Sequence, residues 1–199
     1  MMEDEKQRCG WTANDPLMEI YHDKVWGVPL HNDQKLFEFI ILETFQAGLS
    51  WKTILHKRPH FKEAFAQFNP EEVSLFTEEK KEELAQNAGI IRNKRKISAA
   101  VSNARAFLKI QKEFGSFDTY IWQFVNNKPI VTHRKESEPA LAKSPVSEVM
   151  SKDLKRRGFK FVGPTICYAF MQAVGMVNDH HTSCFRYAEI NKIQKNLKG

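Results

Sequence analysis

The 199-residue sequence predicts an all-α fold, and three observations support this. Apolar residues recur at the three- and four-residue spacing of a helix in most segments. Most of these runs begin at a capping residue such as Asn, Asp, Ser or Thr, and no apolar–polar alternation typical of a strand extends beyond a few residues. With 42% apolar residues the chain can bury one core, so we expect one helical domain over residues 1–185 and a basic tail over 186–199. The alternative is that two closely packed helical subdomains make up residues 1–185.

Four helices are predicted in the first third of the chain. They begin at Pro16, at Asn32 or Asp33, after Ser50 and at Pro59. The second is apolar on nearly all sides, which predicts a central position, and Gly48 at its end can adopt a left-handed cap. We expect the third to be short, from Trp51 to Lys57.

The remainder of the chain alternates between helices and tight connections. The first part is a charged helix from Thr77 to Gly89, followed by a tight hairpin and a long amphipathic helix that carries Ile97 to Ile110. A helix over Ser116–Val125 and an extended loop over Asn126–Pro145 come next. The last parts are a helix from Pro145 to Arg157 and a second hairpin at Gly163-Pro164 with a helix after it. Two pairs of helices therefore have the form helix, hairpin, helix.

Two cysteines and two histidines near the ends of the chain form a candidate zinc site. Cys9 and His22 lie near one end, while His180 and Cys184 are spaced i, i+4 and would share a face if their segment were helical. Four protein ligands would make the zinc structural, because no position is left for a reacting water. The alternative is that the histidines are hydrogen-bonded and the cysteines are small buried groups. Three cysteines do not indicate a disulfide framework.

The second hairpin is a candidate DNA-binding element. Backbone N–H groups at the start of its second helix, beside Gly163 and Thr165, can bind a phosphate without reading sequence. The alternative is a simple corner between two helices. A net charge of +6 favours a polyanionic partner, although many proteins with a mixed-charge surface have a similar excess.

Glu43 and Gln46 lie in the otherwise apolar central helix. A carboxylate at such a position has either a functional role or a structural one, for example at the N-termini of neighbouring helices. Nearby aromatic residues are more often part of the core than of a ligand site, but aromatic rings around a buried acid can hold an extruded base. The aromatic candidates are Trp11, Tyr21, Trp26 and Trp51.

Six blocks of the sequence together closely resemble the bacterial 3-methyladenine DNA glycosylase I family. In order, they are RCGW, YHDKVWGVP, LETFQAGLSW, AGIIRNKRKI, GFKFVGPTICYAFMQAVG and NDHHTSC, and they span about residues 8 to 185. The resemblance implies a helix-hairpin-helix glycosylase fold, one structural Zn²⁺ at Cys9, His22, His180 and Cys184, and a base pocket of Glu43, Tyr21 and Trp51. Trp11, Trp26 and Gln46 would complete the wall of that pocket.

The resemblance also implies the activity. We expect a monofunctional enzyme that flips 3-methyladenine out of double-stranded alkylated DNA and hydrolyses its glycosidic bond, with Glu43 as the catalytic residue. Asp179 occupies a position that suggests a catalytic acid, but it could equally support His180 or cap a helix. We further expect a monomeric, cytoplasmic protein that does not bind membranes. The alternative function is a zinc-stabilised protein that recognises damaged DNA without cutting a bond.

Overall fold

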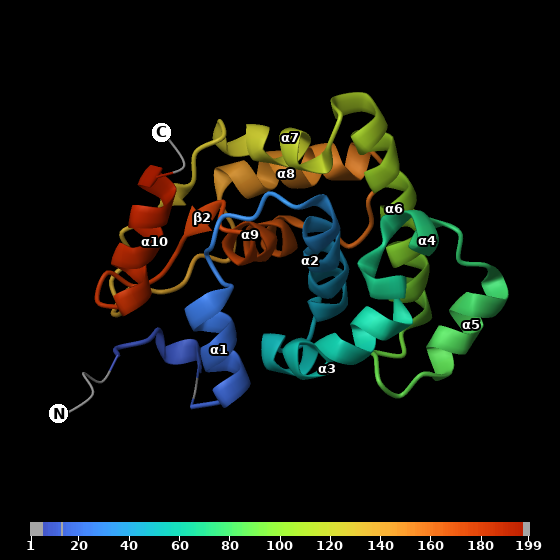
Figure 1. Ribbon diagram of the computed structural model, residues 1–199, viewed down its shortest axis with the longest axis horizontal. Helices are drawn as coiled ribbons and strands as arrows, with labels where there is room; N and C mark the ends of the chain where they lie inside the picture. The colour runs from blue at the N-terminus through green and yellow to red at the C-terminus, as the bar shows by residue number, and fades with distance from the viewer. Residues whose placement is uncertain (1–5, 13, 197–199) are drawn as a thin grey trace.

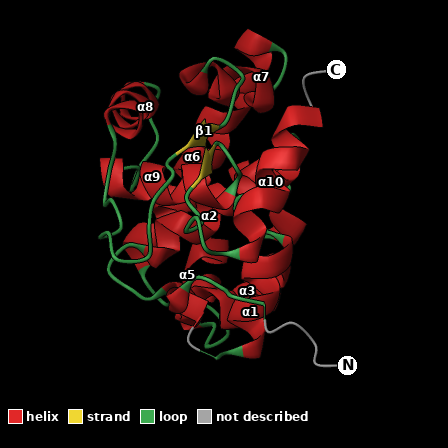
Figure 2. Cartoon of the chain, turned by 90° about the vertical axis from the view of Figure 1, so that its left-hand side faces the viewer, coloured by secondary structure: helices red, strands yellow, loops and turns green. Residues whose placement is uncertain are grey.

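The computed structural model describes residues 6–12 and 14–196, and it is mostly helical, as predicted (Figure 2). The helices are α1 (Pro16–Lys24), α2 (Asp33–Gln46), α3 (Trp51–Ala64), α4 (Pro70–Ser74), α5 (Glu78–Gln86), α6 (Lys94–Phe114), α7 (Phe117–Trp122), α8 (Pro145–Arg156), α9 (Pro164–Ala173) and α10 (Phe185–Asn196). Two-residue strands, β1 (Ile130–Val131) and β2 (Val177–Asn178), and short 3-10 turns at Gly10–Thr12, Ala66–Phe68 and Gln123–Val125 complete the described chain.

The predicted central helix α2 lies in the middle of the molecule and packs against α3, α6, α7 and α9 (Figure 1). All residues from Phe39 to Phe45 are buried, including the polar Glu43 and Thr44. The left-handed backbone predicted at Gly48 is present, with φ of +81°. Helices α1 and α10 lie on the same side of the molecule, so the first and last parts of the described chain are neighbours.

The predicted break before Pro59 is wrong, because Trp51–Ala64 forms one continuous helix, α3, with Pro59 inside it. Proline removes one helical N–H donor, but Pro59 is exposed, so solvent can bind the carbonyl that loses its partner. The charged helix α5 begins as predicted after Thr77, but it ends at Gln86 rather than Gly89.

The predicted loop over residues 126–145 is attached to the rest of the molecule by a small parallel ladder. Ile130 pairs with Val177, and Val131 pairs with Asn178. Two residues per strand are too few to produce a visible alternation in the sequence. Residues 179–184, which follow β2, are not helical, so the condition for the i, i+4 spacing is not met and a turn determines where His180 and Cys184 lie.

The predicted basic tail contains a helix that is part of the fold. In α10, Ile190 is fully buried, and the backbone N–H of Phe185 donates to the carbonyl of Gln7 at 3.0 Å. This hydrogen bond joins the first described residues to the last helix. None of the helices within the described part of the chain has the length and apolar character needed to cross a membrane.

The segment between α1 and α2 is packed tightly against the end of α9. The N–H groups of Gly27 and Leu30 donate to the carbonyls of Gln172 and Val174 at 3.0 and 3.1 Å. Gly175 has φ of +74°, and a Cβ there would lie only 2.4 Å from the backbone of Val28 and Pro29. A glycine is therefore required where the two segments meet.

Lys96 fixes the end of α2 that carries the candidate site. Its buried Nζ donates to the carbonyl oxygens of Phe45 and Ala47 at 2.8 and 2.6 Å, and these carbonyls have no partner within the helix. Burial lowers the pKa of this amine. The side chain thus acts as a cap supplied from α6.

We predict that Lys96→Met lowers the free energy of unfolding by about 1–3 kcal/mol, because it leaves these two carbonyls without their donor. Urea denaturation followed by circular dichroism measures the change. Lys94→Met is the matched control, since the Lys94 side chain is 67% exposed and forms a surface ion pair with Glu82, and it should cost less than about 0.5 kcal/mol. Equal losses in the two variants would contradict the capping role.

Candidate active site and metal cluster

A cavity of about 280 Å³ lies where α1, α2, the start of α3, α9 and the 126–145 loop meet. Its volume is close to the lower end of the range for small-molecule sites, about 300 Å³. All six residues that the sequence indicated as a pocket line it, and the other lining residues are Met18, Arg134, Ala140, Ala169 and Gln172.

One wall of the cavity is aromatic. Tyr21 and Trp51 have ring centroids 5.1 Å apart, and Trp11 and Trp26 are also 5.1 Å apart, in an edge-on arrangement. Trp51 is placed by Ser50, whose hydroxyl accepts from the N–H of Thr53 and caps α3. Such rings can stack on a planar ligand that enters between them.

Glu43 supplies the acid of the cavity. It is 3% exposed, and its Oε2 is buried without a hydrogen-bond partner among the described residues. Burial raises the pKa of Glu43 to about 8. Trp11 and Trp51 each carry a buried Nε1–H that also lacks a partner in the described chain. Because buried polar groups are normally satisfied, these three atoms indicate a polar ligand for the cavity.

We predict that Glu43→Gln stabilises the fold at high pH. Between the usual pKa of 4.5 and the raised value of about 8, the folded protein retains a proton that the unfolded chain has lost. The free energy of unfolding of the wild type therefore falls as the pH rises through this window. The Gln side chain of the Glu43→Gln variant cannot ionise, so the variant keeps the stability that the wild type loses. The difference between variant and wild type should be near zero at about pH 4.5 and should reach roughly 2–4 kcal/mol at about pH 8.

Chemical denaturation of both proteins across this pH range measures the difference, and other titrating groups cancel because they are common to both. A difference that does not change with pH would show that Glu43 has an ordinary pKa.

A second, polar wall was missed by sequence reasoning. Arg134 and Gln172 line the cavity, and both donate to Asp179, which is fully buried. Gln172 Nε2 lies 2.7 Å from Asp179 Oδ2, and Arg134 Nε lies 3.3 Å from Oδ1. Arg134 belongs to a loop without periodicity, so no sequence signal could place it here. Asp179 itself is not among the cavity-lining residues.

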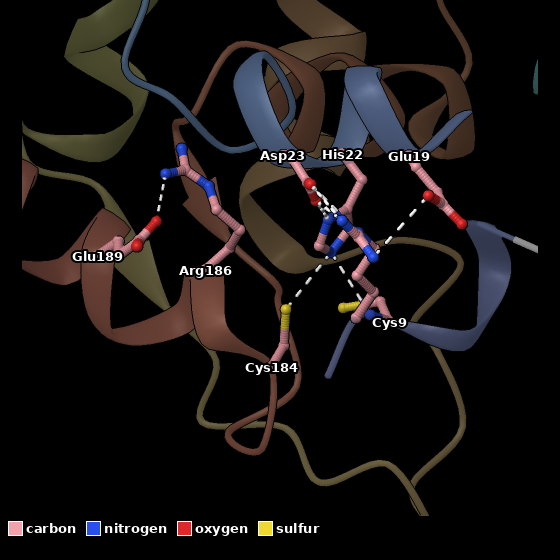
Figure 3. Close-up of polar contacts among 8 residues, drawn as sticks. Cys9, Glu19, His22, Asp23, Cys184, Arg186 and Glu189 are labelled. Carbon is pink, nitrogen blue, oxygen red and sulfur yellow. Dashed lines mark hydrogen bonds and ion pairs between the residues drawn. The ribbon is translucent and has the colours of Figure 1, made fainter. Parts of the chain in front are cut away.

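Cys9, His22 and Cys184 form a buried cluster in which the three potential ligand atoms lie within 4.8 Å of one another. His22 Nε2 lies 3.4 Å from Cys184 Sγ, and its Nδ1 lies 2.8 Å from Asp23 Oδ1. Figure 3 shows the two sulfur atoms on the same side of the His22 ring. A carboxylate on the second ring nitrogen is the usual arrangement for a metal-binding histidine.

His180 lies beside this cluster. Its ring centroid is 5.0 Å from that of His22, and its Nδ1 is 2.9 Å from Asn178 Oδ1. The remaining nitrogen, Nε2, is buried and has no partner among the described residues. An imidazole whose Nδ1 is bound and whose Nε2 is free and buried has the chemistry of a metal ligand.

The two thiols of the cluster differ in acidity. A hydrogen bond from Cys9 and contact with His22 lower the pKa of Cys184, while the same hydrogen bond and burial raise the pKa of Cys9. A thiolate is the form that binds metal. The donor set of the cluster therefore suits zinc, which favours sulfur and nitrogen ligands.

Trp11 and Trp26 connect the cluster with the cavity. Trp11 lies 5.3 Å from His22, and Trp26 lies 4.6 Å from His180, measured between ring centroids. Both tryptophans also line the cavity. Anything that moves the cluster therefore moves one wall of the cavity.

The predicted DNA-binding residues lie at the start of α9. Gly163 is its N-cap and Pro164 its first residue, and Thr165 is exposed. A Cβ at Gly163 would meet nothing within 4 Å, so the glycine leaves open space in front of the helix N-terminus. The hairpin geometry predicted from the sequence is present.

A model of the methyladenine glycosylase family matches residues 11–187 of this chain. The chain belongs to the 3-methyladenine DNA glycosylase I family. DNA-3-methyladenine glycosylase 1 of Escherichia coli (strain K12) is 49% identical over 181 residues, which cover 91% of this chain and 97% of the relative.

Solved structures of this family have the same fold. A crystal structure of 3-methyladenine DNA glycosylase I matches with a TM-score of 0.88 at 50% identity, over 90% of this chain and 98% of that one. A variant of such a glycosylase, solved in complex with 3-methyladenine, matches with a TM-score of 0.87 at 36% identity, over 89% and 96% of the two chains. The fold and family predicted from the sequence are confirmed.

Proposed function

We propose that this protein is a monofunctional DNA glycosylase that hydrolyses the N-glycosidic bond of 3-methyladenine in alkylated double-stranded DNA. The observation that carries the proposal is the buried carboxyl group of Glu43, whose Oε2 has no partner among the described residues, in an aromatic cavity of about 280 Å³. Family membership supports the same reaction, as does the 3-methyladenine bound to a relative of the same fold. The base would enter this cavity after extrusion from the duplex.

The lesion itself supplies much of the driving force. Methylation at N3 gives the base a positive charge, so it leaves as a neutral molecule when the bond from the sugar C1′ to N9 breaks and both electrons stay with N9. A water molecule then adds to C1′ and loses a proton, which gives an abasic sugar. The protein has two tasks. It extrudes the nucleotide, at a cost of a few kcal/mol, and it favours the positively charged, oxocarbenium-like sugar electrostatically.

Glu43 and the aromatic rings perform the recognition in this scheme. The Glu43 carboxyl group accepts a hydrogen bond from the exocyclic amine, and it complements the cationic base when it is ionised. Trp51 stacks on the base, and Tyr21 packs beside Trp51. Trp11, Trp26 and Gln46 complete the wall. Neutral adenine gains less from these contacts, because it lacks the positive charge.

The α8–α9 hairpin would hold the DNA backbone. The free N–H groups at the N-terminus of α9 attract a phosphate, and the open space at Gly163 allows close approach. Thr165 offers an exposed hydroxyl group in the first turn. No sequence is read by such contacts, which suits an enzyme that must act wherever a lesion occurs.

We predict that Glu43→Gln reduces the release of 3-methyladenine by about 100-fold or more, because the charge that complements the cationic base is lost. Trp51→Ala should reduce it by about tenfold, since stacking on an aromatic ring contributes about 1–3 kcal/mol per base. Release from methylated duplex DNA is measured by chromatography of the free bases.

Glu38→Gln is the matched control for Glu43→Gln. Glu38 also lies on α2, but it pairs with Arg58 outside the cavity, so release should change less than about twofold. Undamaged duplex should stay intact with every variant. Salt-sensitive DNA binding without any base release by the wild type would contradict the proposal and support a non-catalytic damage-binding protein.

We infer that the cluster at the two ends of the chain holds one structural zinc ion through Cys9, His22, His180 and Cys184. The buried Nε2 of His180, which has no partner in the described part of the chain, supports this residue as the fourth ligand. The metal would join α1 and the segment before it to the segment before α10, with no position left for a reacting water. Zinc would thus stabilise the fold, while Glu43 and the aromatic residues act on the base.

We predict one zinc per chain in the wild type and loss of that zinc in Cys184→Ser. A crosslink that closes most of the chain contributes on the order of 5 kcal/mol, so the free energy of unfolding should fall by a comparable amount. Atomic emission spectroscopy measures the zinc content per chain. Thermal and urea denaturation measure the free energy of unfolding.

Cys167→Ala is the control, because Cys167 is buried in the core and is not part of the cluster. This variant should keep its zinc. Loss of base release in Cys184→Ser with unchanged stability would contradict a structural role, since it would place the metal in the reaction.

A further inference from the structure

The polar wall formed by Arg134, Gln172 and Asp179 has no role in the scheme above. Asp179 is fully buried and accepts hydrogen bonds at both oxygens. Oδ2 binds Gln172 Nε2 at 2.7 Å, while Oδ1 binds Thr132 Oγ1 at 2.7 Å and Arg134 Nε at 3.3 Å. Such a network holds its members in one orientation.

The orientation of the Gln172 amide follows from this network. Asp179 offers two acceptors, so the amide must turn its NH₂ group towards Asp179 and its oxygen Oε1 away from it. No described residue donates to Oε1, and this atom is not among the buried unpartnered atoms of the described chain. Because Gln172 lines the cavity, Oε1 is an accessible acceptor at the cavity wall.

Arg134, the other member of the wall, has few donors left for a ligand. Nη1 lies 2.7 Å from His181 Nε2 and 3.5 Å from the Glu138 carbonyl, and Nη2 donates to the Asp179 carbonyl at 3.1 Å. Gln172 is therefore the member of the wall that can still accept a hydrogen bond from a ligand.

We propose that Gln172, fixed by Asp179, is a specificity-determining residue that accepts a hydrogen bond from the exocyclic amino group of the methylated base and thereby rejects 6-oxo purines. This inference rests on the proposed function. The amino group of adenine has two N–H donors, so Glu43 and Gln172 can each accept one. Guanine carries an oxygen at the same position, and that oxygen would face the Gln172 acceptor without a proton between them.

Glu43 is not fixed in this way, because its Oε2 has no hydrogen-bond partner among the described residues. Its carboxyl group can therefore reorient around the bound base. Gln172 differs because its amide cannot turn over without breaking its hydrogen bond to Asp179.

The test compares 3-methyladenine with 3-methylguanine. Duplex DNA is methylated with a labelled reagent, the two released bases are separated, and the ratio of their release rates is determined for each variant. Gln172→Met keeps the length of the side chain and removes the acceptor, and it should lower the adenine-to-guanine ratio about tenfold, which corresponds to about 1.4 kcal/mol. Asp179→Asn allows the amide to turn over and should lower the ratio at least as much.

Thr132→Val is the matched control. It removes a hydrogen bond to Asp179 Oδ1, the oxygen that does not bind Gln172, so the ratio should stay within about twofold of wild type. Zinc content and melting temperature are measured for each variant, because Asp179 precedes His180. Calorimetric binding of the two free bases gives a second ratio that does not require bond cleavage.

An unchanged ratio in Gln172→Met, or an equal loss for both bases, would overturn the inference. Wild-type protein that binds the free bases with this preference but releases neither from DNA would contradict the proposed function and leave the role of Gln172 supported. The two failures are therefore distinguishable.

Discussion

The contact between the two ends of the chain, at Cys9, His22 and Cys184, holds the aromatic half of the cavity in place. Trp11 precedes α1 by a few residues, and both Trp11 and Trp26 pack on imidazole rings at this contact. The hydrogen bond from Phe185 to Gln7 fastens the same two segments. Together with the ion pair between Arg8 and Asp23, these interactions bind the first described residues to the rest of the fold.

The cavity combines two walls that are built in different ways. The aromatic wall depends on packing, and its rings tolerate a planar ligand in several orientations. The polar wall depends on a buried carboxylate, Asp179, which fixes each donor and acceptor in one direction. Glu43 lies on α2 and lines the same cavity, and burial raises its pKa to about 8. In the proposed function, affinity and selectivity thus come from separate parts of the chain.

Much of this could be predicted from the sequence because the signals are local. Caps and helical spacing predict α1, α2, α6, α8 and α9, and a lone carboxylate in an apolar helix predicts that Glu43 is functional. The polar wall could not be predicted, because Arg134 reaches Asp179 only through a two-residue ladder between distant segments. The helix α10 has a weak apolar pattern, and Pro59 hides the continuity of α3 in the sequence. The extent of each of these two helices therefore depends on packing against distant parts of the chain.

The contact between the two ends of the chain also has a consequence for truncation. Cys184 and Phe185 lie near the end of the sequence, and they contact His22 and Gln7 near its start. A chain cut short before Cys184 keeps Glu43 and the α8–α9 hairpin, but it loses these contacts to the segment that carries Trp11. A cavity whose two halves are joined only by the last part of the chain is therefore complete only in a chain of nearly full length.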